Sequence, residues 1–192
     1  MNAPKLYMVI VGCKPLGRFT EQHDVFFGIG NSLRDLVPQM NSFWKEANGD
    51  IHIDAWREIA TVDNYAVHIT EKRDRSEPSG QIKLFFINLG GYKKNELEEY
   101  HYKVVTAAKD KGEAIRKSKQ TAFYKHCGFK GAESHVDDKY GIDVDDLYEI
   151  EDILSFGIKN KYSIDLSLVE HVVPDELNIG YLKIDKLLES DL

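Results

Sequence analysis

Cysteine is scarce in this sequence: two thiols occur in 192 residues, and no CxxC pair is present. Two cysteines are too few for a disulfide scaffold or a zinc ribbon. Long apolar runs are also missing, because the run that begins at Leu6 ends before Lys14. We therefore expect neither a signal peptide nor a membrane span, and a cytoplasmic protein without a membrane partner.

An excess of basic charge is absent as well. The chain has 25 basic and 32 acidic side chains and a net charge of −7, which argues against nucleic-acid binding as its main role. What is present is a hydrophobic content of 42% and an aromatic content of 11%. This composition is typical of a folded chain with a buried core, and it excludes a disordered one.

An internal duplication is the main feature of the sequence. The segment LYMVIVG from Leu6 is echoed 78 positions later by LFFINLG from Leu84, and Gly12 matches Gly90 at the same spacing. Self-similarity at one spacing indicates a repeated structural unit. We therefore expect a first repeat over residues 5–69, a linker over 70–82, a second repeat over 83–154 and a C-terminal extension over 155–192.

The hydrophobic periodicity predicts the order ββαββ in each repeat. Apolar β-branched runs predict strands, and helical spacing of apolar residues follows Ser32 in the first repeat and Asp110 in the second, both of which can cap a helix. Pro38 predicts a kink or a broken first turn in the first helix. Residues 161–172 and 178–184 predict two more strands that extend a sheet edge. The expected fold class is α+β, with tandem ββαββ repeats, mainly antiparallel sheet and one helix packed on it from each repeat.

Each repeat contains an E-x-H and an H-x-D pair, and residues two apart on a strand point to the same face. The first repeat supplies Glu21, His23, His52 and Asp54. The second supplies the counterparts Glu99 and His101 at the spacing of 78, and His135 and Asp137 at a spacing of 83 that follows a five-residue insertion. Imidazoles and carboxylates gathered in this way suit divalent metal binding or general acid–base catalysis. A structural network that ties two strands together is the alternative. The pattern identifies neither a particular metal nor a cofactor.

The loop that begins at Gly12 has the outline G-x-x-x-x-G of a phosphate loop. Arg18 and Phe19 stand where a Walker loop needs Lys and then Ser or Thr, so a hairpin turn is favoured. Lys14 and Arg18 could still contact an anion, and the second repeat carries Lys93 and Lys94 near the matching position.

Two other features suggest chemistry but have simpler explanations. Cys13 could be a nucleophile if Lys14 and Arg18 depress its pKa, although a lone cysteine usually serves packing. Residues 133–152 carry nine acidic side chains, yet they lack a calcium-loop pattern and are typical of a solvated face.

The stretches EQHDVFFGIG and HIDAW, together with ESHVDDKYGIDVDDLYEIEDIL in the second half, resemble a bacterial family called domain of unknown function 1543. The resemblance covers roughly residues 5–154 and implies one or two copies of a domain without an assigned activity. The positions that match its motif are Gly12, Gly17, Arg18, Glu21, Gln22, His23, Asp24, His52, Asp54 and Trp56. The second repeat departs from the first at Tyr100, Tyr102 and Lys139, so the first repeat is the better candidate for a single active site.

Three hypotheses follow. The first is a binding or interaction module, built as an internal pseudo-dimer, for a protein or small-anion partner. The second is a metal-dependent or acid–base enzyme acting on a small anionic substrate, with Lys14, Arg18, Gln22, Asp24 and Trp56 in ligand contact. The third is a nucleotide or nucleic-acid binder that uses the basic residues and exposed tyrosines.

Overall fold

The computed structural model describes residues 3–72, 81–92, 95, 97–120 and 142–190. The chain divides into two compact units. Unit 1 consists of residues 1–74 together with 153–192, and unit 2 consists of residues 75–152. The C-terminal extension therefore belongs to the same unit as the N-terminal segment.

The main sheet of unit 1 has the strand order β10-β3-β1-β2, and every neighbouring pair is antiparallel. Its strands are β1 (Lys5–Cys13), β2 (Gln22–Gly30), β3 (His52–Glu58) and β10 (Asn178–Lys183). The continuously apolar β1 lies inside the sheet, as expected for a strand that is buried over most of its length. The predicted strand in 178–184 is confirmed, and it forms the edge next to β3.

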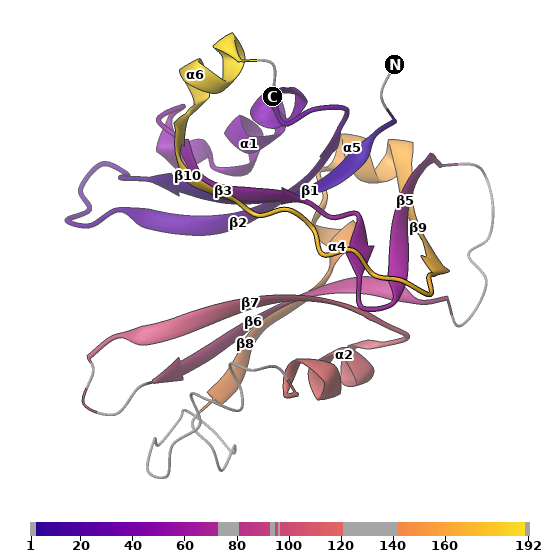
Figure 1. Ribbon diagram of the computed structural model, residues 1–192. Helices are drawn as coiled ribbons and strands as arrows, with labels where there is room; N and C mark the ends of the chain where they lie inside the picture. Colours follow the sequence, from indigo (N-terminus) through magenta and orange to yellow (C-terminus); the bar gives the residue numbers. More distant parts are fainter. Residues whose placement is uncertain (1–2, 73–80, 93–94, 96, 121–141, 191–192) are drawn as a thin grey trace. The chain divides into compact units, whose positions relative to one another are not determined.

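Helices cover one face of this sheet (Figure 1). After β2 comes the 3-10 turn η1 (Arg34–Leu36), which leads into α1 (Val37–Phe43). A second 3-10 turn, η2 (Lys45–Ala47), follows α1 before β3 begins. Pro38 lies in the first turn of α1, where its missing N–H costs nothing. The predicted helix thus begins with a 3-10 turn, and α1 starts one residue before Pro38. The core on this face joins strand, α1 and α6 residues, including Val9, Val11, Cys13, Ile53, Met40 and Leu187.

A smaller sheet in unit 1 has the order β4-β5-β9. Its strands are β4 (Thr61–Val62), β5 (Tyr65–Glu71) and β9 (Tyr162–Leu168), so the other predicted strand of the extension is also confirmed. Three short helices complete the C-terminal part of the chain: α4 (Ile150–Ile153), α5 (Phe156–Lys161) and α6 (Ile184–Glu189).

Unit 2 contains the antiparallel sheet β7-β6-β8 with α2 packed on one face (Figure 1). Its elements are β6 (Lys83–Tyr92), β7 (Glu99–Ala108), α2 (Lys111–Ser118) and β8 (Ile142–Glu149). Asp110 caps α2 as predicted, because its Oδ1 accepts a 2.8 Å hydrogen bond from the backbone N–H of Glu113. The fold is therefore α+β with mainly antiparallel sheets.

Candidate functional site

Gly12 is the centre of the polar cluster predicted in the first repeat. It lies opposite His23 in the β1–β2 ladder and opposite His52 in the β1–β3 ladder. Residues paired across a ladder share a face of the sheet, so both imidazoles belong to the face of Gly12. The neighbouring β1 residues Val11 and Cys13 point into the core under α1, and the cluster is therefore on the face away from that helix.

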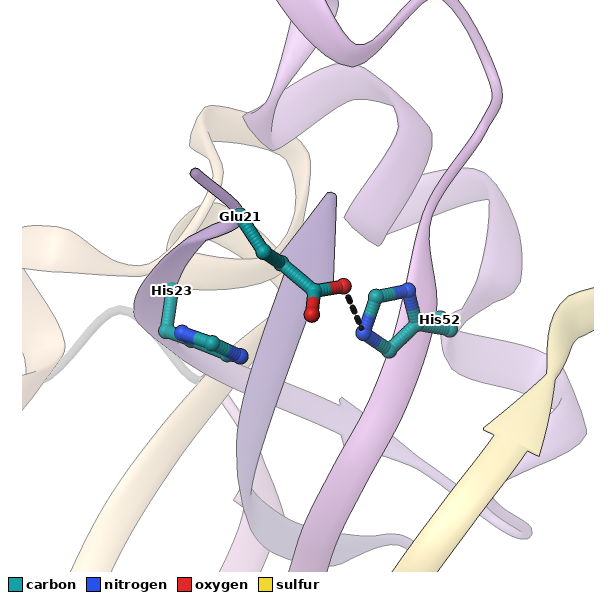
Figure 2. A group of neighbouring side chains, drawn as sticks. All are labelled: Glu21, His23 and His52. Atoms are coloured by element: carbon teal, nitrogen blue, oxygen red, sulfur yellow. Dashed lines mark ion pairs between the residues drawn. The ribbon is translucent and has the colours of Figure 1, made fainter. Parts of the chain in front are cut away.

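The four predicted side chains lie within reach of one another. His52 Nε2 is 2.8 Å from Glu21 Oε1 and 3.4 Å from Asp54 Oδ1, and His23 Nε2 is 3.1 Å from Asp54 Oδ2. Figure 2 shows the Glu21 carboxylate between the two imidazoles. The metal-ligating atoms of Glu21, His23 and His52 all lie within 4.8 Å of one another.

His52 and its neighbours differ strongly in exposure. The His52 side chain is 9% exposed, whereas those of Glu21 and His23 are 45% and 48% exposed. The buried atoms His52 Nε2 and Asp54 Oδ2 make these ion-pair contacts but form no hydrogen bond with a described residue. Both interpretations of the pattern, a structural network and a ligand site, fit these contacts.

Tyr181 of β10 packs against the ring of His52. The two ring centroids are 4.5 Å apart and the ring planes are inclined by 36°. The sequence did not suggest Tyr181, because its place beside His52 follows from the pairing of the C-terminal β10 with β3. The aromatic contact helps to fix the orientation of the imidazole.

The basic loop is a hairpin connection between β1 and β2, as favoured over a phosphate loop. The backbone N–H of Arg18 donates to the Pro15 carbonyl at 3.1 Å, and Gly17 has a φ of 81°, which glycine adopts easily. A strand rather than a helix follows. Lys14 and Arg18 thus belong to the connection that ends at Glu21, and Leu16 and Phe19 in the same loop are fully exposed.

Three of the residues predicted to contact a ligand belong to the other face of the sheet. Gln22, Asp24 and Trp56 are paired with core-facing residues of β1 and therefore point away from the cluster. Trp56 packs against the core, 6.2 Å from the ring of Tyr7. These three side chains are not part of the cluster that His23 and His52 form.

Cys13 also points away from the cluster. Its side chain is 1% exposed, and burial raises the pKa of the thiol above its ordinary value, with a smaller contribution from the negative charges of Asp50 and Glu21. The suggestion that Lys14 and Arg18 depress this pKa is therefore wrong. Cys13 is a packing residue in the core under α1.

In unit 2 a similar group forms around Gly90. Glu99, His101 and Asp145 have their ligating atoms within 4.8 Å of one another, and His101 Nε2 is 3.3 Å from Asp145 Oδ2. The predicted counterparts His135 and Asp137 lie outside the described residues. Asp145 was not predicted. The segment DVDD at residues 143–146 could have suggested it, because Asp143 and Asp145 are two residues apart, as in the E-x-H and H-x-D pairs.

No helix in the described part of the chain is both long and apolar enough to span a bilayer.

No curated protein matches the chain. The fold is similar to that in the crystal structure of a protein Il1583 from Idiomarina loihiensis. The TM-score is 0.62 and the sequence identity 18%, over 94% of this chain and 98% of that chain. At this identity the likeness concerns the fold alone. Residues 18–69, which include Glu21, His23, His52 and Asp54, match the family described as Domain of Unknown Function (DUF1543), so the family resemblance is confirmed over that segment.

Proposed function

We propose that unit 1 binds a divalent transition-metal ion through Glu21, His23 and His52. The observation that carries this proposal is the buried Nε2 of His52, which lies 2.8 Å from Glu21 Oε1 and 3.4 Å from Asp54 Oδ1. A cation among these atoms would bind the imidazole nitrogens and would offset the facing negative charges of the carboxylates.

The donor set favours zinc or a similar ion. Two imidazole nitrogens and a carboxylate oxygen are a common set of protein ligands for Zn²⁺. Asp54 approaches both imidazoles, and it can either donate an oxygen or orient the histidines. Glu21 and His23 are about half exposed, which leaves room for water or a small anion on the ion.

The openness of this group also favours a second function, metal-assisted or acid–base catalysis on a small anionic substrate. His23 is half exposed and paired with Asp54, the arrangement in which a carboxylate orients an imidazole for proton transfer. Lys14 and Arg18 lie in the adjoining hairpin connection and could attract the anion. Two of the four basic residues of the nucleotide-binding alternative, Lys93 and Lys94, lie outside the described residues.

We further propose that the two units are copies of one module and form an internal pseudo-dimer. The hydrogen bonds at the start of the helical segment in each unit support this proposal. In unit 1, Asp35 donates its N–H to Ser32 Oγ at 3.4 Å and accepts from the N–H of Asn31 at 3.0 Å. In unit 2, 78 positions later, Glu113 makes the matching pair of bonds with Asp110 and Lys109.

Strand register supports the same proposal. The β1–β3 ladder shifts register between Ile10 and Val11, and the β6–β8 ladder shifts between Asn88 and Leu89. These positions are also 78 residues apart. A β-bulge is a specific local feature, so its recurrence at the same spacing argues for common descent of the two units.

Calorimetric titration of the tag-free, metal-free chain with Zn²⁺ tests the metal proposal. We expect His52→Ala and His23→Ala each to weaken Zn²⁺ binding at one site by about tenfold or more. His68→Ala is the control, because His68 is a histidine of unit 1 on β5 that contacts Ser167 instead of the cluster. Unchanged Zn²⁺ binding in both cluster variants, or no binding by the wild type, would overturn the proposal.

A further inference from the structure

We propose that unit 2 carries a second divalent-cation site, formed by Glu99, His101 and Asp145, that takes a harder ion such as Mn²⁺. This inference goes beyond the proposed function of unit 1 and stands on residues of unit 2 alone. It concerns side chains from two strands that flank the central β6, in a part of the sheet where β6 carries Gly90.

The backbone ladder explains why these side chains meet. His101 lies opposite Gly90 in the β6–β7 ladder, and Glu99 is two residues earlier on the same strand and therefore on the same face. Asp145 falls at the register shift of β8 against β6. A register shift of this kind can re-aim a side chain, and here the carboxylate reaches over the neighbouring strand.

Gly90 makes this reach sterically possible. A Cβ on Gly90 would overlap the carboxylate of Asp145, with both Cγ and Oδ1 only 2.8 Å from it. The carboxylate therefore occupies the space that a side chain on β6 would fill. This close approach brings Asp145 Oδ2 to 3.3 Å from His101 Nε2, and the Glu99 carboxylate joins them within 4.8 Å.

The chemistry of the three donors separates this site from the one in unit 1. One imidazole and two carboxylates give a harder, more anionic set than two imidazoles and one carboxylate. All three residues are exposed, so water can complete an octahedral shell. Oxygen-rich sites with water ligands suit Mn²⁺ or Mg²⁺. Mn²⁺ lies at the weak end of the divalent series, and we expect weaker binding than that of Zn²⁺ in unit 1.

Titration of the full-length, metal-free chain with Mn²⁺, followed by the EPR signal of the free ion, tests the inference. We expect His101→Ala and Asp145→Asn each to weaken Mn²⁺ binding by about tenfold or more. Asp146→Asn is the matched control: it makes the same change of charge one residue away, and Asp146 accepts a hydrogen bond from Asn88. Circular dichroism melts of all variants establish that each chain is folded.

His52→Ala distinguishes this inference from the proposed function. Mn²⁺ binding that survives His52→Ala and is weakened by Asp145→Asn supports the unit 2 site, even if Zn²⁺ binding proves independent of His52. Mn²⁺ binding that is lost in His52→Ala and retained in Asp145→Asn assigns the ion to unit 1 and overturns the inference. Wild-type affinity in both His101→Ala and Asp145→Asn, or no Mn²⁺ binding by the wild type, overturns it as well.

Discussion

Gly12 lies directly opposite His52 in the β1–β3 ladder, and the imidazole of His52 occupies the space that a side chain at position 12 would need. A Cβ on Gly12 would overlap His52 Nε2 and would lie 2.9 Å from Cε1 and 3.0 Å from Asp54 Oδ2. Because Gly12 has no side chain, the buried imidazole of His52 and the carboxylate of Asp54 can come together over this position of β1.

Replacing this glycine tests that relationship. We expect Gly12→Ala to displace the His52 ring, to cost about 1–3 kcal/mol of stability through overpacking, and to weaken Zn²⁺ binding by about tenfold. Calorimetric titration and thermal melts measure the two effects. Gly157→Ala is the control, because a Cβ there meets nothing within 4 Å. A Gly12→Ala protein with wild-type Zn²⁺ affinity would contradict the proposed metal site.

Asp175 ties the segment before β10 to the start of β4. Its side chain is 2% exposed, and its Oδ1 accepts hydrogen bonds of 3.1 Å from the backbone N–H groups of Ala60 and Thr61. We expect Asp175→Ala to lower the free energy of unfolding by about 1–3 kcal/mol, because two backbone N–H groups lose an acceptor whose own side chain is buried. Asp175→Asn keeps an acceptor and should cost less. Urea unfolding measures both, with the exposed Glu170→Ala as control; equal stability of Asp175→Ala and wild type would contradict this account.

The cap of α2 gives a third prediction. Removal of the Asp110 carboxylate leaves the backbone N–H of Glu113 without its side-chain acceptor. We expect Asp110→Ala to destabilise the chain by about 1 kcal/mol, and Asp110→Ser, which restores a capping oxygen, to recover most of that loss. Thermal melts at one pH compare the three proteins. Equal melting temperatures for the alanine and serine variants would show that the capping bond contributes nothing.

The buried thiol of Cys13 is expected to lower the free energy of unfolding as the pH becomes alkaline. Burial raises the pKa of this thiol in the folded state above its ordinary value near 9.0, so folding favours the protonated form. The contribution of Cys13 is fully present below the pKa of the unfolded chain. It is lost as the pH rises from there through the raised pKa of the folded state.

Urea unfolding at pH 7.5 and at pH 10 measures this effect. We expect the loss of unfolding free energy between the two pH values to be smaller in Cys13→Ala than in wild type. Met40→Ala, another fully buried residue of the same core, removes packing without a titrating group and should keep the wild-type pH dependence. An identical dependence in Cys13→Ala and wild type would exclude Cys13 as its source.

Local patterns in the sequence were sufficient to predict much of the site. The two-residue spacing of Glu21 with His23 and of His52 with Asp54 is typical of a strand. His52 and Asp54 do lie on one strand, β3, whereas Glu21 immediately precedes β2, and its carboxylate lies 2.8 Å from His52. The apolar run of β1 identified the central strand between them. These features depend on neighbours in sequence, and sequence patterns report such neighbours directly.

Features that depend on long-range pairing were not predicted. Tyr181 reaches His52 because β10 pairs with β3 across more than a hundred residues. Asp145 reaches His101 because of a register shift, and a shift of one residue changes which side chains meet. The family resemblance suggested Trp56 as a ligand contact, but the shift in the β1–β3 ladder and its pairing with Val9 turn it toward the core.

The division of the chain has a consequence for its synthesis. Unit 2 ends at residue 152, whereas unit 1 needs β9 and β10, which come from residues 162–183. A ribosome therefore makes every residue of the second unit before the last strands of the first. Domains generally fold as units during translation. We therefore expect unit 2 to complete its fold on the ribosome before unit 1, because the sheet of β1, β2 and β3 lacks β10 until the end of synthesis.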